Sequence, residues 1–217
     1  MRHCAGAWKY TKNRDKYPAL EDYYPELIKV FKELSEKELG EDFFTVDYNG
    51  PINASFDDKN MKRTVIIIPT NEKDEAVEKD IGVYCRALKE KVFKDSEVLT
   101  DMEALEKDLS DYMIICYGTM EGNLWLAKHE DILPFRVESG KIIADKVYEE
   151  TGLVLISGLP NPQNCKLPLL VYTAQNAKDI IEINSIYHGS TDYVIAKSGE
   201  IVFQGNYLKN GKHWSFE

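Results

Sequence analysis

Two apolar stretches limit the folds that this chain can adopt. Residues 64–69 read TVIIIP and residues 112–118 read YMIICYG, and neither alternates apolar with polar residues. A strand with one face in water shows that alternation, whereas a strand covered on both faces does not. Helix-forming residues follow each stretch. The pattern therefore predicts buried parallel strands with helices packed on both sides.

The rest of the chain after residue 63 continues to alternate between strand and helix patterns. Residues 74–93 carry apolar side chains at helical spacing, and Asp101 is placed to cap a following short helix. The sequence thus predicts an α/β domain of the three-layer Rossmann or flavodoxin type, with a mostly parallel sheet and a β-hairpin insert at residues 134–148. The remaining expected strands are residues 96–100, 152–157, 168–174 and a pair within 192–207, and the remaining helices are 102–109, 123–133 and 176–189.

The first fifty residues have a different pattern. Residues 21–40 predict an amphipathic helix, in which Leu27, Phe31 and Leu34 share one face and Gly40 ends the helix. A turn signal follows at residues 49–51. We therefore expect an N-terminal helical arm over residues 1–50 and an α/β domain over residues 51–217.

Charge and composition exclude several classes of partner and cofactor. The net charge of −10 opposes binding to nucleic acid, and no apolar run reaches the length of a membrane helix. Residues 1–16 lack the apolar segment of a signal peptide. We expect a soluble chain with no compartment indicated, although its parent protein could still be exported. The cysteines form no CxxC pair and the histidines are scattered, so neither a metal nor a cofactor is expected.

Four loops are candidates for a ligand site. In an open parallel sheet, ligands bind beyond the carboxyl ends of the strands. The loops expected there are rich in Gly, Pro, Asn or Thr. They comprise residues 69–75, 117–123, 158–166 and 173–179.

The loop at residues 117–123 reads YGTMEGN and contains the main candidates. Gly118 and Gly122 form GxxxG, which matches neither a dinucleotide fingerprint nor a P-loop. Thr119 or Asn123 can cap the following helix, and the charge of Glu121 disfavours a phosphate. The loop is either a structural turn or a weak anion or ligand site. The candidate ligand-binding residues are Cys116, Gly118, Thr119, Gly122, Asn123 and Asn161.

No complete catalytic set is evident. A nucleophile would be Cys116, Cys165 or Ser157, with His129 or His188 as the base. The sequence around Ser157 lacks the GxSxG elbow of serine hydrolases. The His188 region is explained more simply as a helix end followed by a turn. We therefore assign no catalytic residue.

Four motifs, in their order along the chain, carry a resemblance to a known family. They are GPINASF (residues 50–56), ICYGTMEGNLWLAKHEDILPF (115–135), SGLPNPQN (157–164) and FQGNYLKNGKHW (203–214). Together they resemble the C-terminal α/β domain of many bacterial secreted esterase- or prolyl-oligopeptidase-like α/β-hydrolases. In those proteins the catalytic serine belongs to a separate domain. The chain departs from them at residue 159, where the family favours Tyr, and in its first fifty residues.

These observations predict a non-catalytic accessory or interaction domain whose partner is a hydrolase domain or another protein. Glycan or protein binding would then use exposed aromatic residues, unless these pack the arm on the core. The alternative is a small-molecule-binding protein, hydrolase or transferase that uses a crevice between the loops containing Asn123 and Asn161, with Cys116 nearby. The aromatic candidates are Tyr10, Tyr17, Tyr23, Tyr24 and Trp214.

Overall fold

The computed structural model describes residues 63–186, 191–210 and 213–216. The predicted N-terminal arm and the domain boundary at residue 50 lie outside these residues. Within them, no helix has the length and apolar character needed to cross a bilayer.

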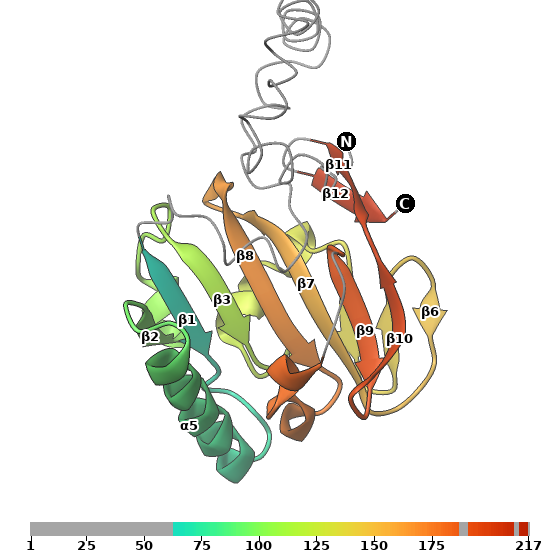
Figure 1. The fold of residues 1–217 in the computed structure, drawn as a ribbon, viewed down its shortest axis with the longest axis horizontal. Helices are drawn as coiled ribbons and strands as arrows, with labels where there is room; N and C mark the ends of the chain where they lie inside the picture. Colours follow the sequence, from blue (N-terminus) through green and yellow to red (C-terminus); the bar gives the residue numbers. More distant parts are fainter. Residues whose placement is uncertain (1–62, 187–190, 211–212, 217) are drawn as a thin grey trace, which may run out of the picture. The chain divides into compact units, whose positions relative to one another are not determined.

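The described residues are organised around a seven-stranded sheet with the strand order β10-β9-β7-β8-β3-β1-β2 (Figure 1). Strand β1 pairs in parallel with β2 and β3, and β3 pairs in parallel with β8. The other three pairings, β8 with β7, β7 with β9 and β9 with β10, are antiparallel. The strands are β1 (Thr64–Ile68), β2 (Glu97–Thr100), β3 (Met113–Tyr117), β7 (Leu153–Asn161), β8 (Asn164–Ala174), β9 (Tyr193–Lys197) and β10 (Glu200–Gly205).

The predicted three-layer, mostly parallel Rossmann- or flavodoxin-like fold is therefore wrong. The sheet is mixed, and the described residues contain only three α-helices. The prediction failed mainly at residues 158–166, which it treated as a loop between two parallel strands. Instead β7 and β8 form one long hairpin in which Pro160 lies opposite Pro168 and Asn161 opposite Asn164.

Each of the three α-helices has a side chain that caps its N-terminus. Asp74 caps α5 (Glu75–Lys91) by accepting from the N–H groups of Ala76 and Val77. Thr100 and Glu103 form a capping box at α6 (Asp101–Leu105), so the cap is Thr100 and not the predicted Asp101. Asn123 caps α7 (Leu124–Lys128), which is shorter than predicted and passes into the 3₁₀ helix η2 (Glu130–Ile132).

The helix predicted over residues 176–189 is absent from its described part. Residues 177–185 form two 3₁₀ helices, η3 (Ala177–Ile180) and η4 (Ile183–Ser185). Between them Glu182 has a left-handed backbone with φ 68°, which interrupts any α-helix. Ile180 and Ile183 are buried against the sheet, so the segment packs on the core without forming an α-helix.

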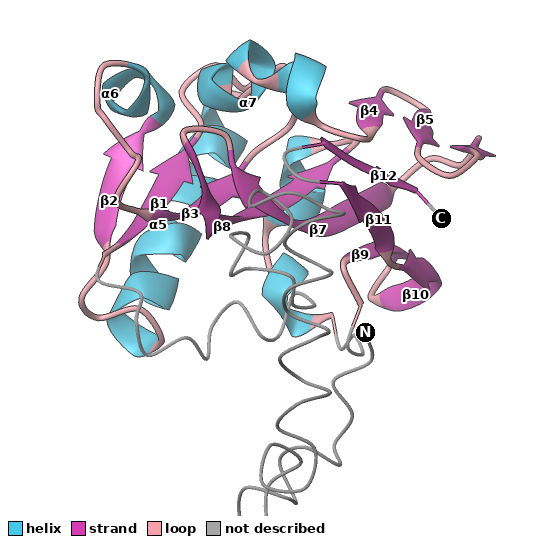
Figure 2. Cartoon of the chain, turned by 90° about the horizontal axis from the view of Figure 1, so that it is seen from above, coloured by secondary structure: helices cyan, strands magenta, loops and turns pink. Residues whose placement is uncertain are grey.

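Each face of the sheet has its own apolar core. On one face, α5 contributes Ile81 and Cys85, and the η3–η4 segment adds its isoleucines. Figure 2 shows α7 on the opposite face of the sheet from α5. There α7 contributes Trp125 and Leu126. Two small sheets add to this second core: β4 (Arg136–Glu138), β5 (Lys141–Ile143) and β6 (Val147–Tyr148), and the hairpin of β11 (Tyr207–Asn210) and β12 (His213–Phe216).

Candidate functional site

The loops after β1 and β3 meet at the carboxyl edge of the parallel strands. Strand β1 leads into α5 on one face of the sheet, and β3 leads into α7 on the other face. Ligands of open α/β sheets bind where successive helices diverge to opposite faces in this way. This edge is therefore where the fold favours a binding site.

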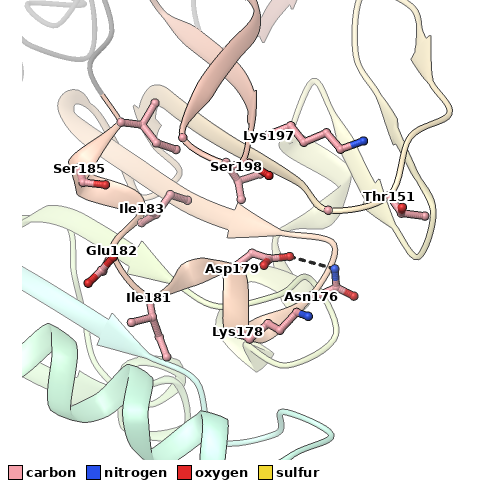
Figure 3. Close-up of a pocket in the computed structure, with 14 residues that line it drawn as sticks. Thr151, Asn176, Lys178, Asp179, Ile181, Glu182, Ile183, Ser185, Lys197 and Ser198 are labelled. Carbon is pink, nitrogen blue, oxygen red and sulfur yellow. Dashed lines mark hydrogen bonds between the residues drawn. The ribbon is translucent and has the colours of Figure 1, made fainter.

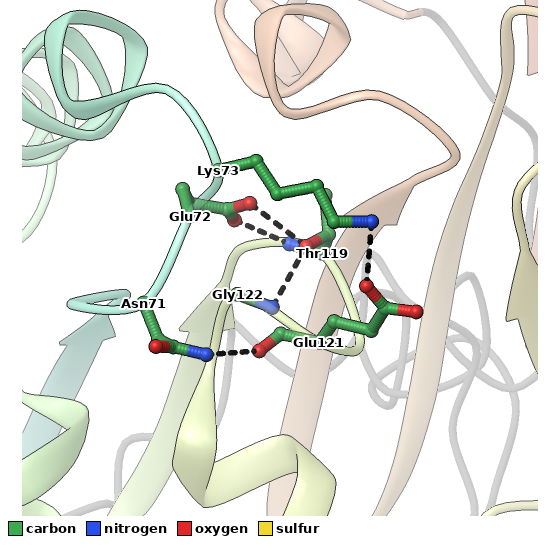
Figure 4. A network of polar contacts seen from close by, with 6 residues as sticks. All are labelled: Asn71, Glu72, Lys73, Thr119, Glu121 and Gly122. Atoms are coloured by element: carbon green, nitrogen blue, oxygen red, sulfur yellow. Dashed lines mark hydrogen bonds and ion pairs between the residues drawn. The ribbon is translucent and has the colours of Figure 1, made fainter.

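The side-chain carboxylate of Glu72, in the loop after β1, is hydrogen-bonded to the loop after β3 (Figure 4). Glu72 accepts a hydrogen bond from the Thr119 N–H at 2.7 Å and another from the Thr119 hydroxyl at 2.8 Å. The same hydroxyl accepts from the Gly122 N–H at 2.9 Å. Glu72 is only 8% exposed. Burial raises the pKa of its carboxyl, while the two bonds from Thr119 act in the opposite direction.

Further contacts join the rims of the two loops. The backbone N–H of Asn71 donates to the carbonyl of Gly122 at 3.0 Å, and its side-chain amide donates to the carbonyl of Glu121 at 3.1 Å. Lys73 and Glu121 form an exposed ion pair at 2.8 Å (Figure 4). The exposed pair adds little stability, but the backbone contacts hold the loops together.

A second carboxylate closes the loops from the end of β2. Asp101 is fully buried and accepts from the Leu124 N–H at the start of α7 at 2.7 Å. It also accepts from the backbone N–H and the hydroxyl of Thr70, in the loop after β1. Asp101 thus links the end of β2 to the loop after β1 and to the start of α7.

The candidate residues of the Gly-bearing loop lie together, and their polar groups are engaged within the protein. Asn123 is buried; its side-chain oxygen Oδ1 accepts from the Leu126 N–H, and its side-chain amide donates to the backbone carbonyl of Tyr117 at 2.8 Å. Gly118 has φ 135°, a conformation that favours glycine. A Cβ on Gly122 would lie 2.0 Å from the carboxyl carbon of Glu72. Glu72 therefore fills the space beside Gly122.

Cys116 lies on β3 below this loop and is fully buried. Burial raises the pKa of its thiol well above the ordinary value. A nucleophilic cysteine needs an accessible thiolate, and this environment favours the neutral thiol.

Asn161 lies at the other end of the sheet, beside the amino-terminal ends of the parallel strands β3 and β8. Because β7 runs antiparallel to β8, its last residue lies beside the start of β8 and of β3. There the Asn161 amide donates to the carbonyls of Leu109 and Tyr112, both at 2.9 Å. The predicted crevice between the loops of Asn123 and Asn161 is therefore not formed.

The remaining catalytic candidates are not brought together. Ser157 is buried on β7 and its hydroxyl bonds that of Tyr207 at 2.8 Å. His129 bonds the carbonyl of Trp125 through Nδ1 at 2.8 Å and packs against its ring. Cys165 follows the turn of the β7–β8 hairpin, and His188 lies outside the described residues. Within the described part of the chain, no cluster of His, Cys, Asp or Glu is arranged to hold a metal ion.

Sequence analysis missed Glu72 and the role of Asp101. Glu72 stood within a loop predicted to line a site, but a carboxylate in a polar loop gives no sign that it will be buried. Asp101 was interpreted as a helix cap. A weak signal for its true role was the Thr100–Glu103 capping box, which leaves Asp101 free for other contacts.

Comparison of the chain with protein-family models found no match, and comparison with curated proteins found none either.

Proposed function

We propose that this chain is a non-catalytic accessory or interaction domain that acts with a hydrolase. One observation carries the proposal: the edge of the sheet where the fold favours a ligand is occupied by the protein's own carboxylates. Glu72 and Asp101 accept from the backbone N–H groups of Thr119, Thr70 and Leu124. An anionic ligand would need these donors, and it would also meet two carboxylates.

The buried nucleophile candidates support the absence of catalysis. Cys116 and Ser157 are both fully buried, and neither has a histidine among its hydrogen-bond partners within the described residues. Acyl transfer by Ser or Cys requires an accessible nucleophile within reach of a base. The crevice of the alternative enzyme hypothesis would also need Asn161, which lies at the other edge of the sheet.

The link to a hydrolase comes from the four ordered motifs. The segments containing YGTMEGN and GLPNPQN resemble those of domains that accompany an α/β-hydrolase domain. Of the aromatic residues suggested for glycan or protein binding, Trp214 is not available at the surface. It is only 7% exposed and contacts Tyr207. Tyr10, Tyr17, Tyr23 and Tyr24 lie outside the described residues.

The test uses a fluorophosphonate probe, which labels active serine hydrolases, together with p-nitrophenyl esters as substrates. The purified chain should neither be labelled nor turn over the esters above the level of a Ser157→Ala/Cys116→Ala variant. An affinity-tagged chain expressed in its native host should copurify with a protein that the probe labels. Turnover by the purified chain that is lost in the double variant would overturn the proposal. Recovery of the tagged chain without any labelled protein would contradict the part of the proposal that names a hydrolase as its partner.

A further inference from the structure

A depression of about 580 Å³ lies away from the closed loops (Figure 3). The η3–η4 segment forms one side, and the other side is formed by the turn before β7 and the β9–β10 turn. Its volume falls within the range of small-molecule sites in proteins. None of the residues that hold the loops after β1 and β3 together contributes to its lining.

The base of the depression is apolar. Val154, Ile183 and Ile186 are buried there, and Ile181 is half-buried. Hydroxyl and amide groups surround this base and can bind peptide or other amide groups. These polar groups belong to Thr151, Asn176, Ser185 and Ser198.

Two of the four charged residues at the rim already have partners. Asp179 accepts from the Asn176 amide at 2.9 Å, and Lys197 forms an ion pair with Glu150 at 3.1 Å. Lys178 and Glu182 have no such partner within the described part of the chain. The depression therefore presents a cation on η3 and an anion between η3 and η4, and neither is paired within the described residues.

The position of Glu182 is fixed at a conformational cost. Its left-handed backbone is unfavourable for a residue with a Cβ. The following residues are held in place because the hydroxyls of Tyr84 and Tyr117 both donate to the side-chain oxygen of Asn184, at 2.7 and 2.9 Å. The strained segment is thus fastened to the core, and Glu182 stays at the rim.

The lining excludes most ligand classes. A purely anionic ligand would meet Lys178 but would also face Asp179 and Glu182, and Lys197 is already paired with Glu150. No aromatic side chain is among the described residues that line the depression, so it lacks a stacking surface for a nucleobase or a sugar ring. A neutral apolar molecule would leave the charged rim unused. A ligand with a charge of each sign and an apolar middle fits all of these features.

We propose that this depression binds a short peptide of about two to four residues with free termini, which spans roughly 7–14 Å when extended. Its carboxylate lies near Lys178, its ammonium group lies near Glu182, and an apolar side chain contacts the half-buried Ile181. The backbone amides of the peptide bond the polar rim. This inference does not depend on the accessory role, which the probe and ester experiment tests separately.

The test is NMR of the full chain with ¹³C-labelled isoleucine methyl groups, titrated with the tripeptide Ala-Leu-Ala. The Ile181 and Ile183 methyl signals should shift, and the same peptide with acetylated and amidated ends should bind several-fold more weakly. Lys178→Gln and Glu182→Asn should each weaken binding of the free peptide by about threefold, as expected for one exposed ion pair. Asn tolerates the left-handed backbone, so Glu182→Asn removes the charge and retains the turn.

Lys128→Gln, on α7 at the other face of the sheet, is the matched control and should bind like the unaltered chain. Absence of any methyl shift up to the solubility limit of the peptide would overturn the proposal. Equal binding of the free and the capped peptide would also overturn it, since the charged rim would then play no part.

Discussion

Glu72 accepts hydrogen bonds from both the backbone N–H and the hydroxyl of Thr119, at 2.7 and 2.8 Å. It thereby joins the loop after β1 to the loop after β3. The carboxylate thus takes up backbone donors at the carboxyl ends of the parallel strands, which is the end of an open sheet where ligands bind. Gly122 is then needed for space and not for ligand approach, because it lies directly against the Glu72 carboxyl group.

Substitution of Gly122 by Ala should destabilise the protein through Glu72. The new Cβ would lie within 2.3 Å of both carboxylate oxygens, so the side chain has to move and lose its bonds to Thr119. We expect a loss of about 1–3 kcal/mol in the free energy of unfolding, measured by urea denaturation.

A double-mutant cycle identifies the cause of that loss. In a Glu72→Ala background the clash is absent, so Gly122→Ala should cost little there. The expected coupling between the two sites is at least about 1 kcal/mol. Simple additivity of the two changes would show that the glycine acts independently of Glu72.

Removal of the buried Asp101 carboxylate should be costly because several donors lose their acceptor together. Asp101→Ala leaves the Thr70 N–H, the Thr70 hydroxyl and the Leu124 N–H without this partner. We expect a loss of about 3 kcal/mol in unfolding free energy, and a smaller loss for Asp101→Asn, which keeps one acceptor oxygen. The exposed Asp111→Ala serves as the control. A loss in the control as large as that of Asp101→Ala would contradict the assignment.

The parallel half of the sheet was predictable from sequence. The apolar runs at residues 64–69 and 112–118 became β1 and β3, and the helical stripe over residues 74–93 became α5. These elements are buried on both faces or carry a continuous apolar stripe, so local pattern and tertiary position agree. The Gly-bearing turn was also correctly located between β3 and α7.

The antiparallel half was not predictable in the same way, because an apolar run does not encode the direction of its strand. The Pro- and Asn-rich stretch at residues 158–166 suggested a loop, yet Pro160 lies opposite Pro168 near the end of the β7–β8 hairpin. The two residues between Asn161 and Asn164 are Pro162 and Gln163, which are not one of the Gly-containing pairs that mark a two-residue hairpin turn, so no local signal indicated the reversal. Because β7 is antiparallel to β8, Asn161 lies at the opposite end of the strands from Asn123, and the two loops do not form the predicted crevice.

The closure of the site by Glu72 was beyond sequence analysis for a different reason. Polar loop residues usually face water, and nothing in PTNEKDE distinguishes Glu72 from its charged neighbours. Its burial depends on the approach of two loops that are 47 positions apart in the chain. A contact of that kind is set by the tertiary arrangement of β1 and β3.

Protonation of His129 should destabilise the folded chain. Partial burial lowers the pKa of its imidazole below the ordinary value, so the unfolded chain binds the proton more readily. Stability should therefore fall as the pH drops through about 6.5, and this contribution is fully lost below the lowered pKa of the folded state. Urea midpoints between pH 7.5 and pH 5.5 measure it. In His129→Gln the slope in this window should become smaller, and an unchanged slope would assign the effect to another group.

Thiol labelling should separate the cysteines by burial. Cys4 lies outside the described residues, so a Cys4→Ser chain is used, which leaves Cys85, Cys116 and Cys165. With an aromatic disulfide reagent, one thiol should react quickly, because Cys165 is half-exposed whereas Cys85 and Cys116 are buried. Burial also raises the pKa of both buried thiols, which lowers their thiolate fraction.

A further Cys165→Ser change should remove the fast phase, and the two remaining thiols should react only at the rate of local or global opening. Fast labelling of Cys116 in that variant would mean that the reagent enters between the loops held by Glu72 and Thr119. Such access would contradict the closed edge on which the non-catalytic proposal depends. Slow labelling of Cys116 that accelerates in Glu72→Ala would instead identify the Glu72–Thr119 contact as what keeps that edge closed.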